Sequence, residues 1–172
     1  TAYLDSVPMV AITGNVATDL IGRDSFQEID ITGITIPITK HNFFVKDVNK
    51  LQSTIREAFV IASSGRPGPV LVDIPKDIQE AYADYEALEP ATKEPTKKAT
   101  DEDITKALEL IAKASRPFIY FGGGAVRAEC QEEIITLSEK INAGIGCSMM
   151  GLSELPSSTP RFLGMQGIHG HY

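Results

Sequence analysis

The sequence lacks the features that mark several large classes of protein. Its two cysteines, Cys130 and Cys147, are too few for a disulfide framework or a cysteine-rich metal site. No apolar run approaches the roughly 20 residues that cross a bilayer. The net charge is -7 and no dense Lys/Arg cluster occurs, which argues against nucleic-acid and anionic membrane partners. We therefore expect a cytoplasmic protein with reduced thiols.

What is present suits a globular protein. The chain has 172 residues, of which 42% are hydrophobic, enough for one domain or parts of two. It opens at Thr1 without an initiator Met and stops at Tyr172, just after a Gly-rich turn. We expect a piece of a longer protein, so the lack of a targeting signal is uninformative.

The stretch 64–77 organises the chain. Gly65 suits the left-handed position after a helix, and the apolar run 70–72 predicts a strand buried on both faces, as in a parallel sheet. The strand's carboxyl end carries Asp73, Lys76 and Asp77. Ligands collect at such ends in α/β sheets, although a solvated strand exit has the same composition.

Apolar periodicity and turn residues indicate an α/β fold of two partial three-layer α/β units. Residues 81–100 are rich in Pro and charge and predict a linker between units at 1–80 and 101–172. The expected elements are strands at 8–13, 69–74, 117–121 and 145–149, helices at 24–28, 48–63, 101–114 and 127–142, an extended segment at 31–38 and a turn at 164–172.

Two glycine-containing turns are candidate binding elements. Gly122, Gly123 and Gly124 join a strand to a helix, where a backbone can approach a ligand and a helix start attracts phosphate. They lack the full dinucleotide spacing, so a simple tight turn is an equal alternative. The turn 167–171 could hold a flat or anionic ligand. We expect no metal there, because His169 and His171 have no nearby third ligand.

Two further groups favour structural roles. Asp24, Glu28 and Asp30 form a local acidic group of the kind found in solvated turns. Cys130 falls on the apolar stripe of a predicted helix, which indicates packing and not a nucleophile.

Six strings occur in one order at domain-like spacings: AYLDSVPMVAITG, IGRDSFQE, ITKHNFFV, SGRPGPVLVDIPKDI, FGGGAV and GIHG. Together they closely resemble the large catalytic subunits of the acetolactate synthase (acetohydroxyacid synthase) family of thiamine diphosphate enzymes. The resemblance covers essentially the whole chain. The string Phe26-Gln27-Glu28, with the glycine triplet, is typical of the FAD-containing biosynthetic branch.

The resemblance implies a domain assignment and an activity. Residues 1–80 correspond to the C-terminal half of the pyrimidine-binding domain, and residues 101–172 to the N-terminal part of the Rossmann-like, FAD-contacting central domain. The family decarboxylates pyruvate and condenses the product with pyruvate or 2-ketobutyrate in branched-chain amino acid biosynthesis. Its cofactors are thiamine diphosphate, Mg²⁺ and FAD. Its members are homodimers or homotetramers, some with a small regulatory subunit.

The resemblance also implies roles for matching residues. Arg66 corresponds to an arginine that contacts FAD, and Gly122, Gly123 and Gly124 to the glycine loop beside it. Ile168, His169 and Gly170 match a Met-His-Gly turn along the flavin, with Ile in place of Met. Phe26, Gln27 and Lys76 match residues near the substrate channel.

No catalytic residue and no metal ligand is expected in this chain. The activating glutamate should lie upstream of Thr1, and the diphosphate–Mg²⁺ site beyond Tyr172, so the chain alone should be inactive. Ala17 stands where many members have Pro, which leaves inhibitor sensitivity open.

Two alternatives remain. One is another flavin-containing thiamine diphosphate enzyme, such as a glyoxylate carboligase or a pyruvate oxidase. The other is a non-catalytic nucleotide-binding or assembly module, against which the 8–77 block counts.

Overall fold

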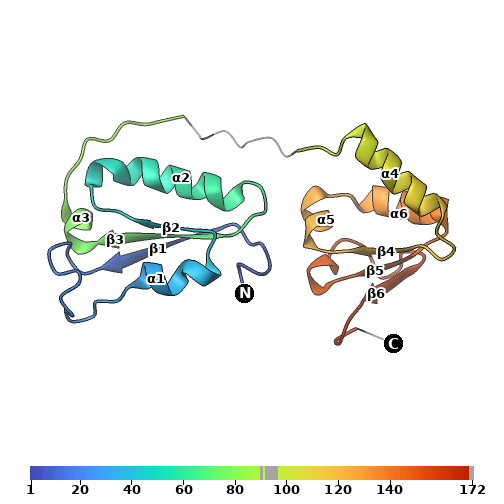
Figure 1. Cartoon of the computed structure of the whole chain (residues 1–172), viewed down its shortest axis with the longest axis horizontal. Helices are drawn as coiled ribbons and strands as arrows, with labels where there is room; N and C mark the ends of the chain where they lie inside the picture. The colour runs from blue at the N-terminus through green and yellow to red at the C-terminus, as the bar shows by residue number, and fades with distance from the viewer. Residues whose placement is uncertain (90, 92–96, 171–172) are drawn as a thin grey trace. The chain divides into compact units, whose positions relative to one another are not determined.

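The computed structural model describes residues 1–89, 91 and 97–170 (Figure 1). The chain divides into two compact units, Thr1–Thr96 and Lys97–Tyr172. Part of the predicted linker, residues 90 and 92–96, lies outside the described residues, as does His171. In the described ranges, every helix is too short or too polar to cross a membrane.

The first unit is a parallel three-stranded sheet with the strand order β1-β3-β2. Figure 1 shows α2 on one side of this sheet and α1 on the other, so the unit has three layers. The strands predicted near 8–13 and 69–74 and the helix near 48–63 are confirmed. The elements are β1 (Met9–Asn15), α1 (Ile31–Thr35), β2 (His41–Phe44), α2 (Leu51–Ser63), β3 (Pro69–Pro75) and α3 (Lys76–Glu80), with 3₁₀ turns at Ile36–Ile38 and Val48–Lys50.

Strand β3 is the centre of the first core. All seven of its residues are buried, as the apolar run predicted. Ala58 and Ala62 of α2 are 0% and 2% exposed, and they pack in one cluster with Val70 and Val72. These small helix residues let α2 lie close to the strand, so that a compact core forms with few large side chains.

The second unit also combines helices with a parallel three-stranded sheet, whose strand order is β4-β5-β6. The α/β fold class is therefore confirmed. Thr100 and Asp103 cap α4 reciprocally, as predicted, with N···O distances of 3.1 and 3.2 Å. The elements are α4 (Asp101–Ala112), β4 (Phe118–Phe121), α5 (Gly123–Ala128), α6 (Gln131–Ile141), β5 (Gly144–Cys147) and β6 (Phe162–Met165), with a 3₁₀ turn at Met149–Gly151.

The extended segment predicted at 31–38 is wrong, because these residues form α1 and a 3₁₀ turn. The Asp30 carboxylate accepts a hydrogen bond from the Gly33 amide at 2.8 Å and caps the helix. The Thr35 hydroxyl donates to the Ile31 carbonyl at 2.7 Å. These local bonds outweigh the strand preference of the Ile and Thr side chains.

The helix predicted at 24–28 is also wrong, because this segment is a series of turns. Asp24 and Gln27 have positive φ angles of 53° and 64°, which an α-helix does not allow. The Glu28 carboxylate accepts from the Gly22 and Ser25 amides instead of facing solvent from a helix.

Three smaller expectations fail at element edges. The apolar run at 8–13 predicts a buried strand, but β1 is an edge strand of the first sheet and Ile12 is 60% exposed. Strand β6 was missed, because it has four residues and includes Gly164 with φ 76°. Cys130 precedes α6 instead of lying on it, although its side chain still packs against the second core.

Replacing Ile145 with Ala should destabilise the second unit by about 2–5 kcal/mol, because Ile145 is 0% exposed at the centre of β5 and its loss leaves a cavity. Urea unfolding followed by far-UV circular dichroism measures the change. Ile104→Ala on α4 is the matched control, because Ile104 is 48% exposed. Equal unfolding midpoints for the two variants would contradict the proposed core.

Candidate functional site

A buried carboxylate lies where β1 and β3 end side by side. Asp73 is 1% exposed. Its Oδ1 accepts a hydrogen bond from the Thr13 hydroxyl at 2.8 Å, and its Oδ2 accepts one from the Asn15 amide at 2.7 Å. Because a buried charge is costly without partners, these two bonds make Asp73 tolerable there. They fix a polar cluster at the carboxyl end of the sheet.

A hollow of about 390 Å³ opens beside this cluster. Its walls combine apolar side chains with three carboxylates, each of which already accepts hydrogen bonds from this chain, so the hollow offers a ligand mainly apolar surface. It lies at the carboxyl ends of parallel strands, where α/β sheets bind ligands. The lining residues are Asn15, Ile21, Gly22, Glu28, Ile29, Asp30, Ile31, Thr32, Phe44 and Asp73.

The outer wall of the hollow is the loop 16–30, which Glu28 holds together. The Gly22 amide, and next the Ser25 amide, donate to the Glu28 carboxylate and hold its pKa below the ordinary value. Asn15 donates to the Ile29 carbonyl at 3.3 Å, which ties the end of the loop to β1. Of the predicted acidic group, Glu28 and Asp30 accept backbone hydrogen bonds, and Asp24 is exposed as expected of a solvated turn.

The three predicted channel residues lie around this edge of the first unit. Phe26 is 89% exposed on the loop, and Gln27 follows it with its positive φ. Lys76 begins α3 directly after β3, and its ammonium lies 3.7 Å from the Glu80 carboxylate. The loop 16–30 and α3 therefore both begin at the carboxyl ends of strands of the first sheet.

Arg66 lies at the opposite end of β3. The strand between Arg66 and Lys76 has seven residues, or roughly 23 Å at about 3.3 Å per residue. Arg66 Nε donates to the Ser6 hydroxyl at 2.8 Å, and Nη2 donates to the Leu4 carbonyl at 3.2 Å. With Tyr3, Lys40, Pro67 and Gly68, Arg66 lines a separate hollow of about 190 Å³.

In the second unit, the two predicted glycine-containing turns follow the carboxyl ends of parallel strands. The triplet 122–124 follows β4, and residues 168–170 follow β6. A Cβ at Gly122 would lie 3.0 Å from the Ser148 hydroxyl, so the loop after β5 approaches the glycine backbone closely. Ile168 is 95% exposed and His169 is also exposed. The fold thus places both turns at the carboxyl ends of the strands of the second sheet.

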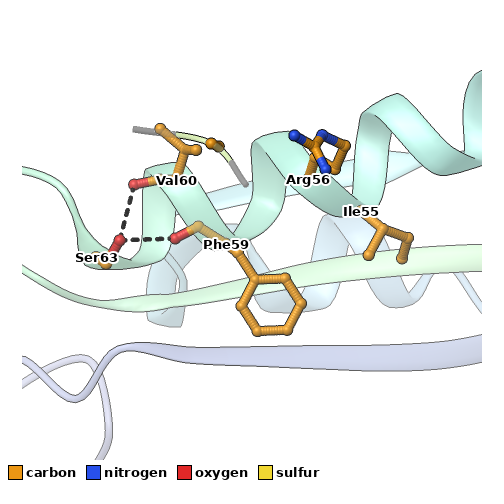
Figure 2. A pocket seen from close by; sticks show the side chains of 6 residues that line it. Ile55, Arg56, Phe59, Val60 and Ser63 are labelled. Carbon is orange, nitrogen blue, oxygen red and sulfur yellow. Dashed lines mark hydrogen bonds between the residues drawn. The ribbon is translucent and has the colours of Figure 1, made fainter. Parts of the chain in front are cut away.

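A third hollow, of about 260 Å³, lies on α2 (Figure 2). Ile55, Phe59 and Val60 give it apolar walls. The Ser63 hydroxyl donates to the Phe59 and Val60 carbonyls, and Arg56 donates to the Leu88 carbonyl at 3.4 Å and to that of Glu89. Because its polar side chains already bond to the backbone, we do not assign it chemistry.

Sequence reasoning placed Asp73 at a strand exit but did not link it with Asn15. The two residues are 58 positions apart, so no local pattern joins them. What could have indicated the pair is that each is a polar residue near the end of an apolar strand, and the ends of parallel strands lie side by side.

Comparison with known proteins finds one matching family profile and several similar enzymes. Residues 104–172 match the family profile "Thiamine pyrophosphate enzyme, central domain". The chain is 46% identical over 175 residues to "Acetolactate synthase large subunit" of Haemophilus influenzae, which covers 99% of this chain and 30% of the relative. It is 46% identical over 178 residues to "Acetolactate synthase" of Arthrospira platensis, covering 99% of the chain and 31% of the relative.

A third relative is "Acetolactate synthase isozyme 3 large subunit" of Escherichia coli, 42% identical over 177 residues, with 100% of this chain and 31% of the relative covered. The chain thus spans about 30% of the length of the curated relatives it matches.

Glu28→Gln should loosen the loop 16–30 at neutral pH and remove its acid sensitivity. The folded-state pKa lies below the ordinary 4.5, so the carboxylate stabilises the loop above that pH and loses this effect as the pH falls through the lowered value. NMR titration of the Glu28 carboxyl carbon and the Gly22 amide measures this. Glu57→Gln, at an exposed position on α2, is the control. A Gly22 shift that titrates unchanged in Glu28→Gln would contradict the assignment.

Proposed function

We propose that the chain belongs to the thiamine pyrophosphate enzyme family and forms part of an acetolactate synthase large subunit. The observation that carries the proposal is the identity with proteins of that name along essentially the full chain. A similarity confined to residues 104–172 would have supported only a thiamine pyrophosphate enzyme in general. The first unit therefore makes the proposal specific.

In the proposed reaction, pyruvate loses carbon dioxide and the remaining two-carbon unit is joined to pyruvate or 2-ketobutyrate, in branched-chain amino acid biosynthesis. Thiamine diphosphate, held with Mg²⁺, supplies the carbanion chemistry when it is bound. We assign no catalytic acid, base or metal ligand to this chain. Its residues serve to bind and orient FAD and the 2-ketoacids.

Two features support an FAD contact. Arg66 is held by its bonds to Ser6 and Leu4 and lines an adjoining hollow. A guanidinium held in this way suits a phosphate or a flat ring. In the second unit, the backbone of 122–124 and the turn 168–170 both lie at the carboxyl ends of the strands, which suits a flavin cofactor lying across these ends.

For the substrate channel we propose Phe26, Gln27 and Lys76. An exposed ring, a side-chain amide and an ammonium suit a small 2-ketoacid, whose carboxylate pairs with the cation. The loop 16–30 and α3 both follow the carboxyl ends of strands of the first sheet, so these residues can line one channel mouth.

We propose that the full protein is a cytoplasmic homodimer or homotetramer, with a small regulatory subunit as partner. Relatives named as large subunits support the second partner. Phe118, Tyr120 and Leu163 are 48%, 59% and 59% exposed on the second sheet. Apolar residues on one sheet surface favour a covering layer of protein.

Arg66→Ala should weaken FAD binding by the full-length protein about ten- to a hundredfold, which is the effect of losing a charge-assisted contact of roughly 1.5–3 kcal/mol. Flavin fluorescence titration measures the affinity. Arg23→Ala is the control, because Arg23 is an exposed arginine of the same unit. Unchanged affinity for Arg66→Ala would remove Arg66 from the flavin site.

The 172-residue chain by itself should make no acetolactate from pyruvate, even with thiamine diphosphate, Mg²⁺ and FAD supplied. The reason is that the proposal places no catalytic group in it. A colorimetric acetolactate assay on chain purified from a host lacking the enzyme tests this, with the full-length protein as positive control. Turnover above the blank would show that a catalytic group is present here.

A further inference from the structure

The loop 16–30 is tied to the start of α3 by a carboxylate. Asp77 Oδ1 accepts a hydrogen bond from the Thr18 backbone amide at 3.0 Å, and Oδ2 accepts one from the Thr18 hydroxyl at 2.5 Å. The two residues are 59 positions apart in the sequence. Bonds to an ionised carboxylate are among the stronger hydrogen bonds in proteins, so this contact is a specific tether.

Besides this tether, the Asn15 side chain donates to the Ile29 carbonyl and holds the other end of the loop. Between them, Glu28 closes the loop on itself through Gly22 and Ser25. These bonds make residues 22–28 a closed turn that contains Phe26 and Gln27. Thr18 comes shortly before this turn in the chain, so the tether limits where the turn can lie.

The carboxylate is itself well fixed. Asp77 lies in the first turn of α3, directly after the buried strand β3. Gln79 of the same helix donates to the Ile74 carbonyl at 2.7 Å, which holds α3 against the strand end. Lys76 is the neighbour of Asp77, so the tether connects the predicted channel residues of the loop with the one on α3.

We propose that Asp77 is a positioning residue: its bonds to Thr18 hold the loop 16–30 so that Phe26 and Gln27 face the same channel mouth as Lys76. This inference rests on the proposed function, which supplies the channel. The proposed role requires no contact between Asp77 and substrate, because the bonds to Thr18 carry it. Loss of the tether should let the loop sample other positions and weaken substrate binding more than it slows turnover.

The experiment compares two substitutions at one position in the full-length protein. Thr18→Val removes the hydroxyl and nearly keeps the shape, whereas Thr18→Ser keeps the donor. Asp77→Asn and the double variant Thr18→Val/Asp77→Asn complete a cycle. Asp19→Asn is the control for a lost charge on the loop, because Asp19 is exposed.

The first measurement is hydrogen exchange of the backbone amides of residues 19–28 without cofactors. We expect exchange about tenfold faster in Thr18→Val and Asp77→Asn, as for loss of one charged hydrogen bond, and wild-type rates in Thr18→Ser and Asp19→Asn. The double variant should exchange little faster than either single variant. Wild-type rates in Asp77→Asn would overturn the proposal whatever the kinetics.

The second measurement is the KM for pyruvate and the kcat of the loaded enzyme, with Phe26→Ala as reference. We expect a KM several-fold higher in Asp77→Asn and Thr18→Val with a smaller change in kcat, and recovery in Thr18→Ser. If Phe26→Ala raises KM but Asp77→Asn does not, the positioning role is wrong. If Phe26→Ala leaves KM unchanged, the proposed channel falls and the positioning role with it, although faster exchange would still establish the tether.

Discussion

The burial of β3 between two parallel neighbours is the constraint on which the first unit depends. A strand covered on both faces and hydrogen-bonded along both edges can tolerate a polar side chain only where other groups hydrogen-bond to it. The sequence follows this rule, because Arg66 and Lys76 flank the strand, and Asp73, two residues before its end, accepts bonds from two side chains of β1. The two proposed binding regions of this unit are therefore held at opposite ends of one rigid element.

The sequence predicted the elements whose signals are long or chemically specific. Strand β3, helix α2 and the Thr100–Asp103 cap were all found, because apolar period and capping chemistry act over a few residues. The prediction for segment 31–38 was wrong because side-chain bonds to the backbone decide its structure. Asp30 and Thr35 make these bonds, and they favour a helix although the composition is typical of a strand.

Only part of the candidate site could be predicted from the sequence. Family resemblance supplied roles for Arg66, Phe26 and Lys76, but it could not say that the first lies at the far end of the strand from the third. The Asp73–Asn15 and Asp77–Thr18 bonds were invisible, because each joins residues nearly 60 positions apart. Only a folded chain places such partners together.

The Asp73 carboxylate also has a consequence for how the sheet assembles. Thr13 is directly opposite Asp73 in the pairing of β1 with β3, and Asn15 is two residues further along the same face. A slip of β1 by one residue would turn both donors to the other face and leave a buried negative charge without partners. The edge strand is mostly apolar and could otherwise pair in several alignments. This carboxylate therefore penalises a one-residue slip of the edge strand during folding.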